Sequence, residues 1–405
     1  MTPLLHVLGG SPWQTPTVRR AKALGLRVLV TDMYAERPAY AHADVHEQVD
    51  ITDLDRTLEA ARRHRVQGIV CDTSDVGVPT AAWVAERLGL PGMGYGVALD
   101  FTDKARMRGR LAGTSVPIPA HACAVEPEEL DAAVRRLGLP VVVKPADNQS
   151  GRGVSVVHRP AELAAAWHAA LAHSRSRRVV VEAFVAGAEV IADGYVVDGR
   201  VELLGLADKT PYAENPTISN RILYRSGAAF EELAPRVRPA AGAVIAALGL
   251  RNGVFHAEFM LAAAGVVPID IAARGGGVMI HTCVLQHVSG VDPIAAMIRT
   301  ALGQDPDVHP LLSRRGAVVE FLRLPPGVLQ AVHGLDAALR VPGVAAIHFN
   351  AKPGDPVGAL RQKDDRPGFI VALGDSSDEA VRAAQAARGE LRATLSDPDR
   401  TTAFH

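Results

Sequence analysis

The stretch FHAEFMLAAAGVVPIDIAARGGG, residues 255–277, predicts two short strands joined by a tight turn. Apolar residues dominate both halves, and the small residues 263–265 between them are typical of a hairpin turn. Glu258 and Asp270 fall on the two neighbouring strands, where antiparallel pairing lets their carboxylates point to the same face. Because Mg²⁺ takes oxygen ligands and bridges phosphates, this pair of acids predicts a magnesium site.

A basic residue and three glycines, Arg274 and residues 275–277, follow the second acid closely. This turn is flexible and rich in donors, so it can hold a substrate carboxylate or an oxygen of an acyl phosphate. Asp270 itself lies between two isoleucines, and a buried acid needs a cation or a hydrogen-bond partner. The alternative is therefore a structural ion pair between Asp270 and Arg274.

Upstream, a polar loop with two glycines joins the apolar stretches 141–144 and 154–157, which predict strands. Glycine lets backbone N–H groups come close to phosphate oxygens, so the loop predicts a flexible lid over a nucleotide. A strand–loop–strand arrangement differs from a Walker loop, and the sequence contains no GxxxxGK[ST] pattern. The alternative is a hairpin without a ligand. The loop residues are Gln149, Ser150, Gly151, Arg152 and Gly153.

Lysine is rare in this chain, because only six of its 43 basic residues are lysine. Where lysine persists, a compact point charge is indicated that the planar guanidinium of arginine does not replace. Lys144 ends an apolar strand beside the glycine loop, and a charge there needs an anionic partner such as phosphate. Lys104 lies on a predicted helix between domains, where a solvated helix face is the alternative.

The apolar strand predicted at 178–184 runs into a short hinge and a glycine turn. The hinge can offer backbone N–H and C=O groups to an adenine edge. Glu189, beyond the hinge, can accept hydrogen bonds from ribose hydroxyls. The alternative is an ordinary strand with surface glutamates.

The rest of the chain predicts several domains of α/β and α+β character. The first hundred residues alternate strands and helices at the spacing of βαβ units, which predicts a parallel sheet. The polar segment 211–226 has no clear periodicity and predicts a loop. Helices are expected at 17–24, 54–64, 78–88, 97–111, 127–137, 161–173, 237–248 and 375–392. The expected division is an N-terminal domain at 1–96, a linking helix at 97–116, a small lobe at 117–187, a large lobe at 188–305 and an α+β unit at 306–405.

Composition excludes several classes of function. The net charge is −1 and aromatic residues make up 4% of the chain, so a basic field or stacking platform for nucleic acid is not expected. The apolar runs are far shorter than the ~18 residues of a membrane span. The N-terminus reads as a strand and not as a signal peptide, and three scattered cysteines fit a reducing cytoplasm.

Taken in their order along the chain, these features resemble the motifs of the ATP-grasp superfamily. The resemblance extends to residues 7–32, VLGGSPWQTPTVRRAKALGLRVLVTD, which look like a pre-ATP-grasp domain, and it covers nearly the whole chain. Within the superfamily, the chain is similar to the branch of the carbamoyl-phosphate synthase large chain, biotin carboxylase and amino-acid ligases. The resemblance implies a two-lobed ATP-grasp fold that uses ATP and Mg²⁺.

The resemblance also implies roles for individual residues. Arg274 and Lys144 would be catalytic, and Glu258 and Asp270 would hold Mg²⁺. The residues implied to bind the nucleotide are Lys104, Lys144, Gln149, Ser150, Gly151 and Gly153 at the phosphates, Glu182, Phe184 and Val185 at adenine, and Glu189 at the ribose. Two positions depart from the family, which usually has Glu where Asp270 stands and Asn where Ala272 stands. The missing amide leaves open whether one or two Mg²⁺ ions bind.

The implied reaction is ATP-dependent ligation of a small-molecule carboxylate and an amine into a peptide-like amide, through an acyl phosphate. An alternative is carboxylation or carbamoylation through carboxyphosphate. An NAD-linked oxidoreductase is a further alternative, since Gly9-Gly10 and Asp32 mimic a dinucleotide unit, but Pro12 removes an N–H that pyrophosphate needs. A non-catalytic nucleotide-binding protein is the last alternative, and Ala272 favours it.

Substrate specificity is expected in the segment 211–226. Arg221 and Arg225 are candidate ligands of a substrate carboxylate, because arginine binds carboxylates with two hydrogen bonds, and Gly275 and Gly276 are further candidates at the substrate. The expected partners are small molecules, without nucleic acid or membrane, and a homodimer is the assembly expected from base rates.

Overall fold

A computed structural model describes residues 2–149, 151–311, 315–396 and 401–405. Its first unit is a parallel sheet of order β3-β2-β1-β4, as the alternating pattern predicts. The strands are β1 (Leu4–Leu8), β2 (Arg27–Asp32), β3 (Val45–Gln48) and β4 (Gly68–Val70). The accompanying helices are α1 (Thr15–Ala23), α2 (Leu54–His64) and α3 (Val78–Leu88), with short turns η1 (Pro38–His42) and η2 (Asp75–Gly77).

Two predicted helices of this unit match the structure at both ends because their boundaries have local causes. The side chain of Asp53 accepts the Arg56 N–H at 3.0 Å and so begins α2. Gly89, in the left-handed region with φ of 64°, ends α3. Strand β3 was not predicted, since its four residues are at most half-buried and carry no continuous apolar pattern.

The linking segment is two helices, and the prediction of one helix over 97–111 was wrong. The structure has α4 (Tyr95–Thr102) and α5 (Lys104–Leu111), separated at Asp103. The side chain of Asp103 accepts the N–H groups of Ala105 and Arg106 at 2.9 and 3.1 Å and thereby starts a new helix. The break makes Lys104 the first residue of α5.

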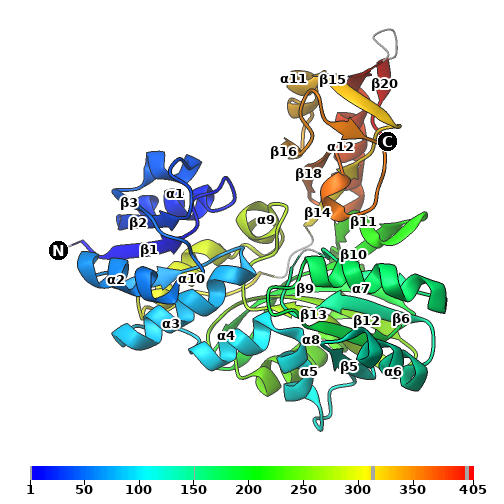
Figure 1. The fold of residues 1–405 in the computed structure, drawn as a ribbon. Helices are drawn as coiled ribbons and strands as arrows, with labels where there is room; N and C mark the ends of the chain where they lie inside the picture. Colours follow the sequence, from blue (N-terminus) through cyan, green and yellow to red (C-terminus); the bar gives the residue numbers. More distant parts are fainter. Residues whose placement is uncertain (1, 150, 312–314, 397–400) are drawn as a thin grey trace.

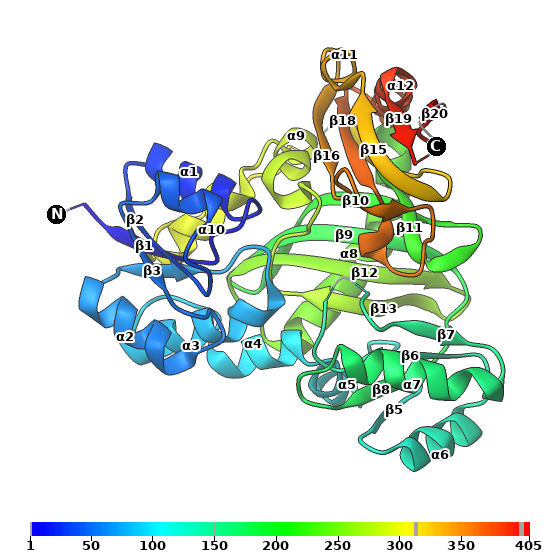
Figure 2. The same cartoon turned by 45° about the horizontal axis from the view of Figure 1, so that its top comes forward.

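The small lobe is an antiparallel sheet of order β5-β8-β6-β7 with helices on one face. In Figure 2 it lies below β13 of the large sheet. Val141, Val143, Val179 and Val181 face the helices, so the alternate residues face the other way. The elements are β5 (His121–Ala124), α6 (Pro127–Leu137), β6 (Val141–Pro145), β7 (Ser155–Val157), η3 (Pro160–Glu162), α7 (Leu163–Ala172) and β8 (Val179–Ala183).

The large sheet has the order β13-β12-β9-β10-β11-β14-β18-β16 and joins the large lobe to the C-terminal unit. Helix α8 (Gly227–Leu248) covers one face, against which Ala257 and Phe259 of β12 are buried. Glu258, between them, points to the opposite face. The strands are β9 (Ala188–Val197), β10 (Arg200–Tyr212), β11 (Asn215–Tyr224), β12 (Gly253–Ala262), β13 (Gly265–Ala272), β14 (Gly316–Leu322), β16 (Val344–Phe349) and β18 (Gly368–Gly374).

Two expectations for this lobe were wrong. The segment 211–226 is not a loop, because most of it belongs to the hairpin of β10 and β11. Its outer part has register shifts at Pro211, which explains the missing periodicity. Helix α8 begins ten residues before the predicted start at 237, and it continues through Pro235 and Pro239.

The C-terminal unit adds a small sheet of order β17-β15-β19-β20 and two helices, which lie above strands β9 to β13 of the large sheet in Figure 2. Its elements are β15 (Gly327–His333), α11 (Leu335–Leu339), β17 (Pro356–Val357), η5 (Lys363–Asp365), α12 (Ser377–Glu390), β19 (Arg392–Leu395) and β20 (Thr401–Ala403). In the described ranges, none of the helices is long and apolar enough to cross a membrane.

One late helix returns to the N-terminal unit. After the π-helical turn η4 (Ile280–Val284) and α9 (Leu285–Ser289), α10 (Pro293–Ala301) places Ile294 and Ile298 in the core beneath β1 and β2. Figure 1 shows α10, in yellow, among the blue elements of that unit. This packing holds the N-terminal sheet against the large lobe and so positions one wall of the site.

Candidate active site

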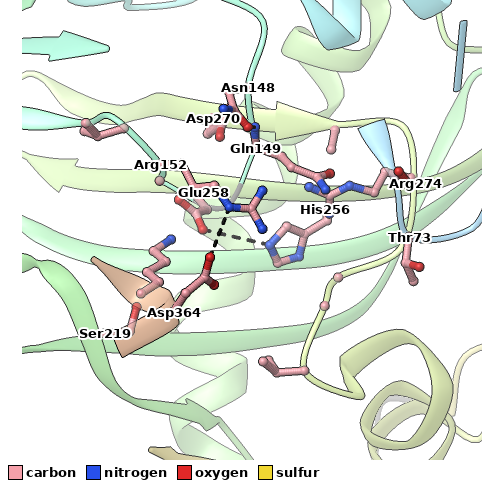
Figure 3. Close-up of a pocket in the computed structure, with 18 of the residues that line it drawn as sticks. Thr73, Asn148, Gln149, Arg152, Ser219, His256, Glu258, Asp270, Arg274 and Asp364 are labelled. Carbon is pink, nitrogen blue, oxygen red and sulfur yellow. Dashed lines mark hydrogen bonds and ion pairs between the residues drawn. The ribbon is translucent and has the colours of Figure 1, made fainter. Parts of the chain in front are cut away.

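A cavity of about 940 Å³ lies where the N-terminal unit, the two lobes and the C-terminal unit meet. Its size is typical of small-molecule sites. The loops after β1 and β2 form one wall, and the small-lobe sheet with its glycine loop forms another. Strands β9 to β13 form the floor, and residues of β18 and η5 close the remaining side. Figure 3 shows the polar side chains that converge there.

The two predicted acids lie directly opposite each other on the floor. Glu258 of β12 and Asp270 of β13 are register partners, which confirms the predicted hairpin and the shared face. Both line the cavity. Carboxylates so placed offer the hard oxygen ligands that Mg²⁺ prefers, with phosphate and water completing its coordination. Among the residues that the structure describes, there is no group of three or more His, Cys, Asp or Glu side chains that could hold a metal by itself.

Each of these acids has a lysine partner. Glu258 is 2.9 Å from Lys209 Nζ, and Asp270 is 3.2 Å from Lys104 Nζ. Burial raises the pKa of both carboxyl groups, but their cationic neighbours outweigh it and hold each pKa below its usual value. Both groups are therefore ionised at neutral pH.

Lys209 was not predicted as a site residue, yet it joins two predicted ones. Its Nζ lies 2.5 Å from Glu189 and 2.9 Å from Glu258, on the central strand β10. Burial lowers the pKa of the ammonium, but the two carboxylates outweigh it and raise that pKa overall. Burial raises the pKa of Glu189 despite the lysine. The only sequence signal for Lys209 was the scarcity of lysine in the chain.

Lys144 belongs to a buried ion-pair network on the small-lobe wall. Its Nζ is 2.8 Å from Glu182, whose other oxygen accepts Arg108 Nε at 2.7 Å. Burial raises the pKa of Glu182, but Lys144 and Arg108 outweigh it and lower the pKa to about 2. Burial lowers the pKa of Lys144. The Glu182 carboxylate, predicted to meet adenine, thus already has two cationic partners, and Arg108 was not predicted.

The hinge between β8 and β9 supplies the other predicted adenine contacts. Phe184 and Val185 both line the cavity, and Phe184 is 38% exposed. The Phe184 N–H donates to Pro140 O at 3.1 Å, so this N–H is not free to donate to adenine. Apolar side chains of Val142, Met260 and Ile269 line the cavity as well and could flank a flat ring.

The glycine loop reaches two other units of the protein. Gln149 Oε1 accepts the backbone N–H of Asp75 in η2 at 2.9 Å. Arg152 Nε lies 3.1 Å from Asp364 Oδ2 in η5, as Figure 3 shows. Gly151, with φ of 67°, lies so close to Lys363 that a Cβ would stand 3.0 Å from its Cε. Ser150 lies outside the described residues. The loop thus lies over the cavity between the N-terminal and C-terminal units.

Arg274 does not pair with Asp270, so the structural alternative considered for it is wrong. Its Nε lies 2.5 Å from Asp75 Oδ1, across the boundary to the N-terminal unit. Burial lowers the pKa of the guanidinium, but Asp75 outweighs it and the pKa is raised. The Gly275 N–H donates to Asp72 O at 2.8 Å, and a Cβ at Gly275 would meet the His281 ring at 2.1 Å. Because Gly275 has no side chain, the turn can approach both Asp72 of the N-terminal unit and the His281 ring of η4.

The predicted substrate arginines lie outside the cavity lining. Arg221 Nη2 is 2.9 Å from Glu320, and Arg225 Nη2 is 2.7 Å from Asp208. Among the candidate substrate glycines, Gly276 lines the cavity, and a Cβ there would lie 2.9 Å from His256 Nδ1.

Two cations from the C-terminal unit reach the cavity instead. Arg366 is 8% exposed, stacks on Phe321 at 3.6 Å and donates to the Ser219 backbone oxygen at 3.1 Å. Its Nε donates to Lys363 O at 2.8 Å, and the negative charge of Asp364 acts on it without a salt bridge to any described residue. Burial, together with Lys209, lowers the pKa of the Lys363 ammonium to about 8. The only sequence signal for Lys363 was the scarcity of lysine, and Arg366 carried no signal beyond its charge.

The dinucleotide-like loop has a structural explanation. Asp32 Oδ2 accepts the Gly10 N–H at 2.8 Å, and Oδ1 accepts the Tyr34 N–H at 3.1 Å. Arg37 Nε lies 3.0 Å from the same carboxylate. Asp32 therefore ties two loops together, and a role as a ribose ligand of NAD has no support from its surroundings.

Comparisons with known proteins agree with this architecture. Three family models match: ATP-grasp N-terminal domain at residues 18–92, ATP-grasp domain at 137–282 and L-amino acid ligase C-terminal domain 2 at 320–396. A formate-dependent phosphoribosylglycinamide formyltransferase from Chlorobaculum tepidum is 31% identical over 369 residues, which cover 87% of this chain and 89% of that relative.

Solved structures share the fold along the whole chain. L-amino acid ligase from Bacillus licheniformis has a TM-score of 0.81 at 19% identity, covering 97% of this chain and 99% of that one. The biotin carboxylase domain of 2-oxoglutarate carboxylase from Hydrogenobacter thermophilus, in complex with MgADP and bicarbonate, has a TM-score of 0.73 at 15% identity, covering 100% and 92%. The predicted fold class and resemblance are confirmed. The chain belongs to the ATP-grasp family and is an ATP-dependent ligase that forms carbon–nitrogen bonds.

Proposed function

We propose that this ligase joins a small-molecule carboxylate, in particular an amino acid, to an amine through an acyl phosphate. The observation that carries the proposal is one cavity in which three groups of charged side chains meet. These are the opposed acids Glu258 and Asp270, the lysines Lys104 and Lys144, and the cations Lys363 and Arg366 of the C-terminal unit. The first two sets suit a magnesium-bound triphosphate, and the third suits an anionic substrate.

In this proposal, the nucleotide lies between the small-lobe sheet and the floor. Lys104 and Lys144 neutralise phosphate oxygens, and the loop containing Gln149, Gly151 and Gly153 covers them with backbone N–H groups. The hinge at Phe184 and Val185 receives adenine, while the Glu182 carboxylate acts by holding Lys144 in place. Glu189, already beside Lys209, accepts the ribose hydroxyls.

Glu258 and Asp270 would hold Mg²⁺, which supplies charge neutralisation at the phosphates. Binding there requires Lys209 and Lys104 to share these carboxylates with the cation or to turn toward the phosphates. Ala272 offers no side-chain oxygen, so a second ion would depend on phosphate and water ligands.

The chemistry follows from these placements. A substrate carboxylate oxygen attacks the γ-phosphorus, the bond to the β-phosphate oxygen breaks, and ADP leaves. The amine then attacks the acyl carbon, loses a proton, and expels inorganic phosphate. Arg274 would stabilise charge on the acyl phosphate after exchanging Asp75 for the substrate. The loop excludes water, which would otherwise hydrolyse the intermediate.

The choice of an amino-acid substrate is supported by the C-terminal unit. Residues 320–396 match the L-amino acid ligase C-terminal domain 2, and this segment contributes Lys363 and Arg366 to the cavity. A buried arginine that donates to two backbone oxygens and forms no salt bridge with a described residue favours an anionic ligand. A reaction through carboxyphosphate is the alternative, and the experiment must distinguish it from the proposed amino-acid ligation.

The test is a screen of ATP consumption with pairs of amino acids, with amine alone, and with bicarbonate plus amine. Release of ADP and phosphate should require both an amino-acid carboxylate and an amine, and mass spectrometry should find the amide. Product formation only with bicarbonate would replace the proposal with a carboxylase. ATP hydrolysis indifferent to every carboxylate would refute both reactions.

A further inference from the structure

Three large apolar side chains of the N-terminal unit are exposed to the cavity. Trp13, Met33 and Tyr34 are 36%, 51% and 53% exposed, and all three line the cavity wall. They lie on the loops that follow β1 and β2, at the carboxyl ends of parallel strands, where ligands of α/β sheets commonly bind. Exposed apolar groups gathered in a concave site indicate a ligand that covers them.

The loops that carry these side chains are held in a fixed arrangement. Asp32 accepts the backbone N–H groups of Gly10 and Tyr34 at 2.8 and 3.1 Å, which joins the first loop to the second. The guanidinium of Arg37 lies 4.0 Å from the centre of the Tyr34 ring and packs on its face. The apolar wall is therefore preorganised and does not need a ligand to form.

Trp13 also spans the gap to the C-terminal unit. Its ring stacks on Phe369 of β18 with centroids 6.3 Å apart and planes at 24°, and its centroid lies 5.1 Å from that of His348. Phe369 itself is buried, so one part of the Trp13 ring is covered while the remainder faces the cavity. The same side of the cavity includes Phe321 with the guanidinium of Arg366 stacked on it.

This apolar wall is distinct from the surfaces assigned to the nucleotide. The hinge at Phe184 belongs to the small lobe, whereas Trp13, Met33 and Tyr34 come from the opposite unit. The phosphate-binding lysines and the acids of the floor are charged and offer nothing to an apolar group. The wall thus faces a part of the cavity that the nucleotide, as placed above, leaves to a second substrate, and burying apolar surface there would favour a carbon-rich one.

We infer that Trp13, Met33 and Tyr34 form a side-chain pocket that selects a substrate with a large apolar or aromatic side chain. The inference rests on the ligase reaction proposed above and specifies its substrate class. The Trp13 ring packs against that side chain while also joining the N-terminal and C-terminal units across the cavity.

The kinetic test compares phenylalanine and leucine with glycine and alanine as substrates of wild type and Trp13→Ala. Wild type should prefer the large side chains, and Trp13→Ala should reduce kcat/KM for them by about 10- to 100-fold through KM, with about threefold or less change for glycine. Trp13→Phe should restore most of the preference. Leu339→Ala, on an exposed residue of α11 outside the cavity, is the control. An equal loss for all substrates would mean that Trp13 only joins the two units and would overturn the inference.

A binding test separates this inference from the reaction. Calorimetry with a non-hydrolysable ATP analogue should show phenylalanine binding to wild type at least about tenfold more tightly than glycine, and Trp13→Ala should remove the difference. Selective binding without amide formation would refute the ligase reaction and keep the pocket. Amide formation without such selectivity would refute the pocket and keep the reaction. Absence of both would refute both.

Discussion

At the scale of single residues, the site is defined by how each charge is compensated. Lys104 and Lys209 pair with acids of the floor, and Lys144 pairs with Glu182 on the facing wall. Arg366, by contrast, is buried, donates to two backbone oxygens and forms no salt bridge with a described residue. A buried charge costs free energy unless it is paired. The lysines are therefore compensated before a ligand binds, whereas the proposed anionic substrate would supply the compensating charge for Arg366.

Lys144 provides the first prediction. Lys144→Met should reduce ATP turnover by roughly 100-fold or more, because the phosphates lose a fixed positive charge in a water-poor site. ADP release measured by a coupled assay checks this, with circular dichroism to establish folding. Lys352→Met should behave as wild type. Turnover of Lys144→Met close to that of wild type would contradict the assigned role.

Asp270 provides the second. Asp270→Asn should raise the Mg²⁺ concentration needed for half-maximal activity by about tenfold or more, since an amide oxygen carries no net charge. A Mg²⁺ titration of activity measures the shift. Asp198→Asn, in the exposed turn between β9 and β10, is a matched control that keeps a residue favoured at positive φ. An unchanged Mg²⁺ dependence would refute the metal assignment.

The sequence predicted the site residues that belong to a local motif. It did not predict those whose partners are brought close only by the folded structure. Glu258 and Asp270 were found because each interrupts an apolar strand of one hairpin. Lys209 and Arg108 were not, because their partners come from distant parts of the chain. Arg366 approaches through the C-terminal unit, whose placement no local pattern determines.

At the scale of elements, helices with local boundary signals were predicted best. Helix α6 matches its prediction at both ends because Pro127 begins it and Gly138 follows it. Strand β11 was predicted as a loop, because its polar residues Thr217 and Ser219 line the cavity and the strand lacks apolar alternation. The break between α4 and α5 depends on the Asp103 side chain, within a segment that otherwise reads as one helix.

The glycine loop provides a prediction at this scale. Asp364→Ala removes the partner of Arg152, so the loop should close less firmly and water should reach the acyl phosphate. The phosphate released for each amide formed should rise about threefold, with little change in overall stability because the pair is exposed.

Two variants bear on that explanation. The exchange Arg152→Asp with Asp364→Arg should restore coupling toward wild type, and Asp336→Ala, an exposed acid of α11, should leave it unchanged. If the exchange is as uncoupled as the single variant, the ion pair is not what holds the loop.

At the scale of the whole molecule, the units are joined by buried or bridging residues. Arg108 of α5 reaches both the small lobe at Glu182 and the large lobe at Ile269 O, the latter at 2.9 Å. Asp75 and Arg274 join the N-terminal unit to the floor. The proposed division at residues 96, 116, 187 and 305 remains a proposal, and β14 and β18 continue the large sheet across the last of these boundaries.

The Glu182 network predicts how stability depends on pH. The folded-state pKa of about 2 lies below the ordinary value of 4.5, so the ionised group stabilises the fold above about pH 4.5 and this contribution is lost as the pH falls toward 2. Its full size is about 3 kcal/mol. Urea unfolding between pH 6 and pH 3 should therefore have a shallower pH dependence in Glu182→Gln than in wild type, while Glu202→Gln, a strand residue paired with Arg200, should keep the wild-type slope. Equal slopes in all three proteins would contradict the network.

The most direct measurement of the central claim is a crystal structure of the protein with Mg²⁺ and a non-hydrolysable ATP analogue. The account predicts the triphosphate between the 149–153 loop and the β12–β13 hairpin, Mg²⁺ bound by Glu258 and Asp270, and adenine at the hinge of Phe184 and Val185. A nucleotide bound instead at the glycine loop after β1, or a metal away from both acids, would contradict it.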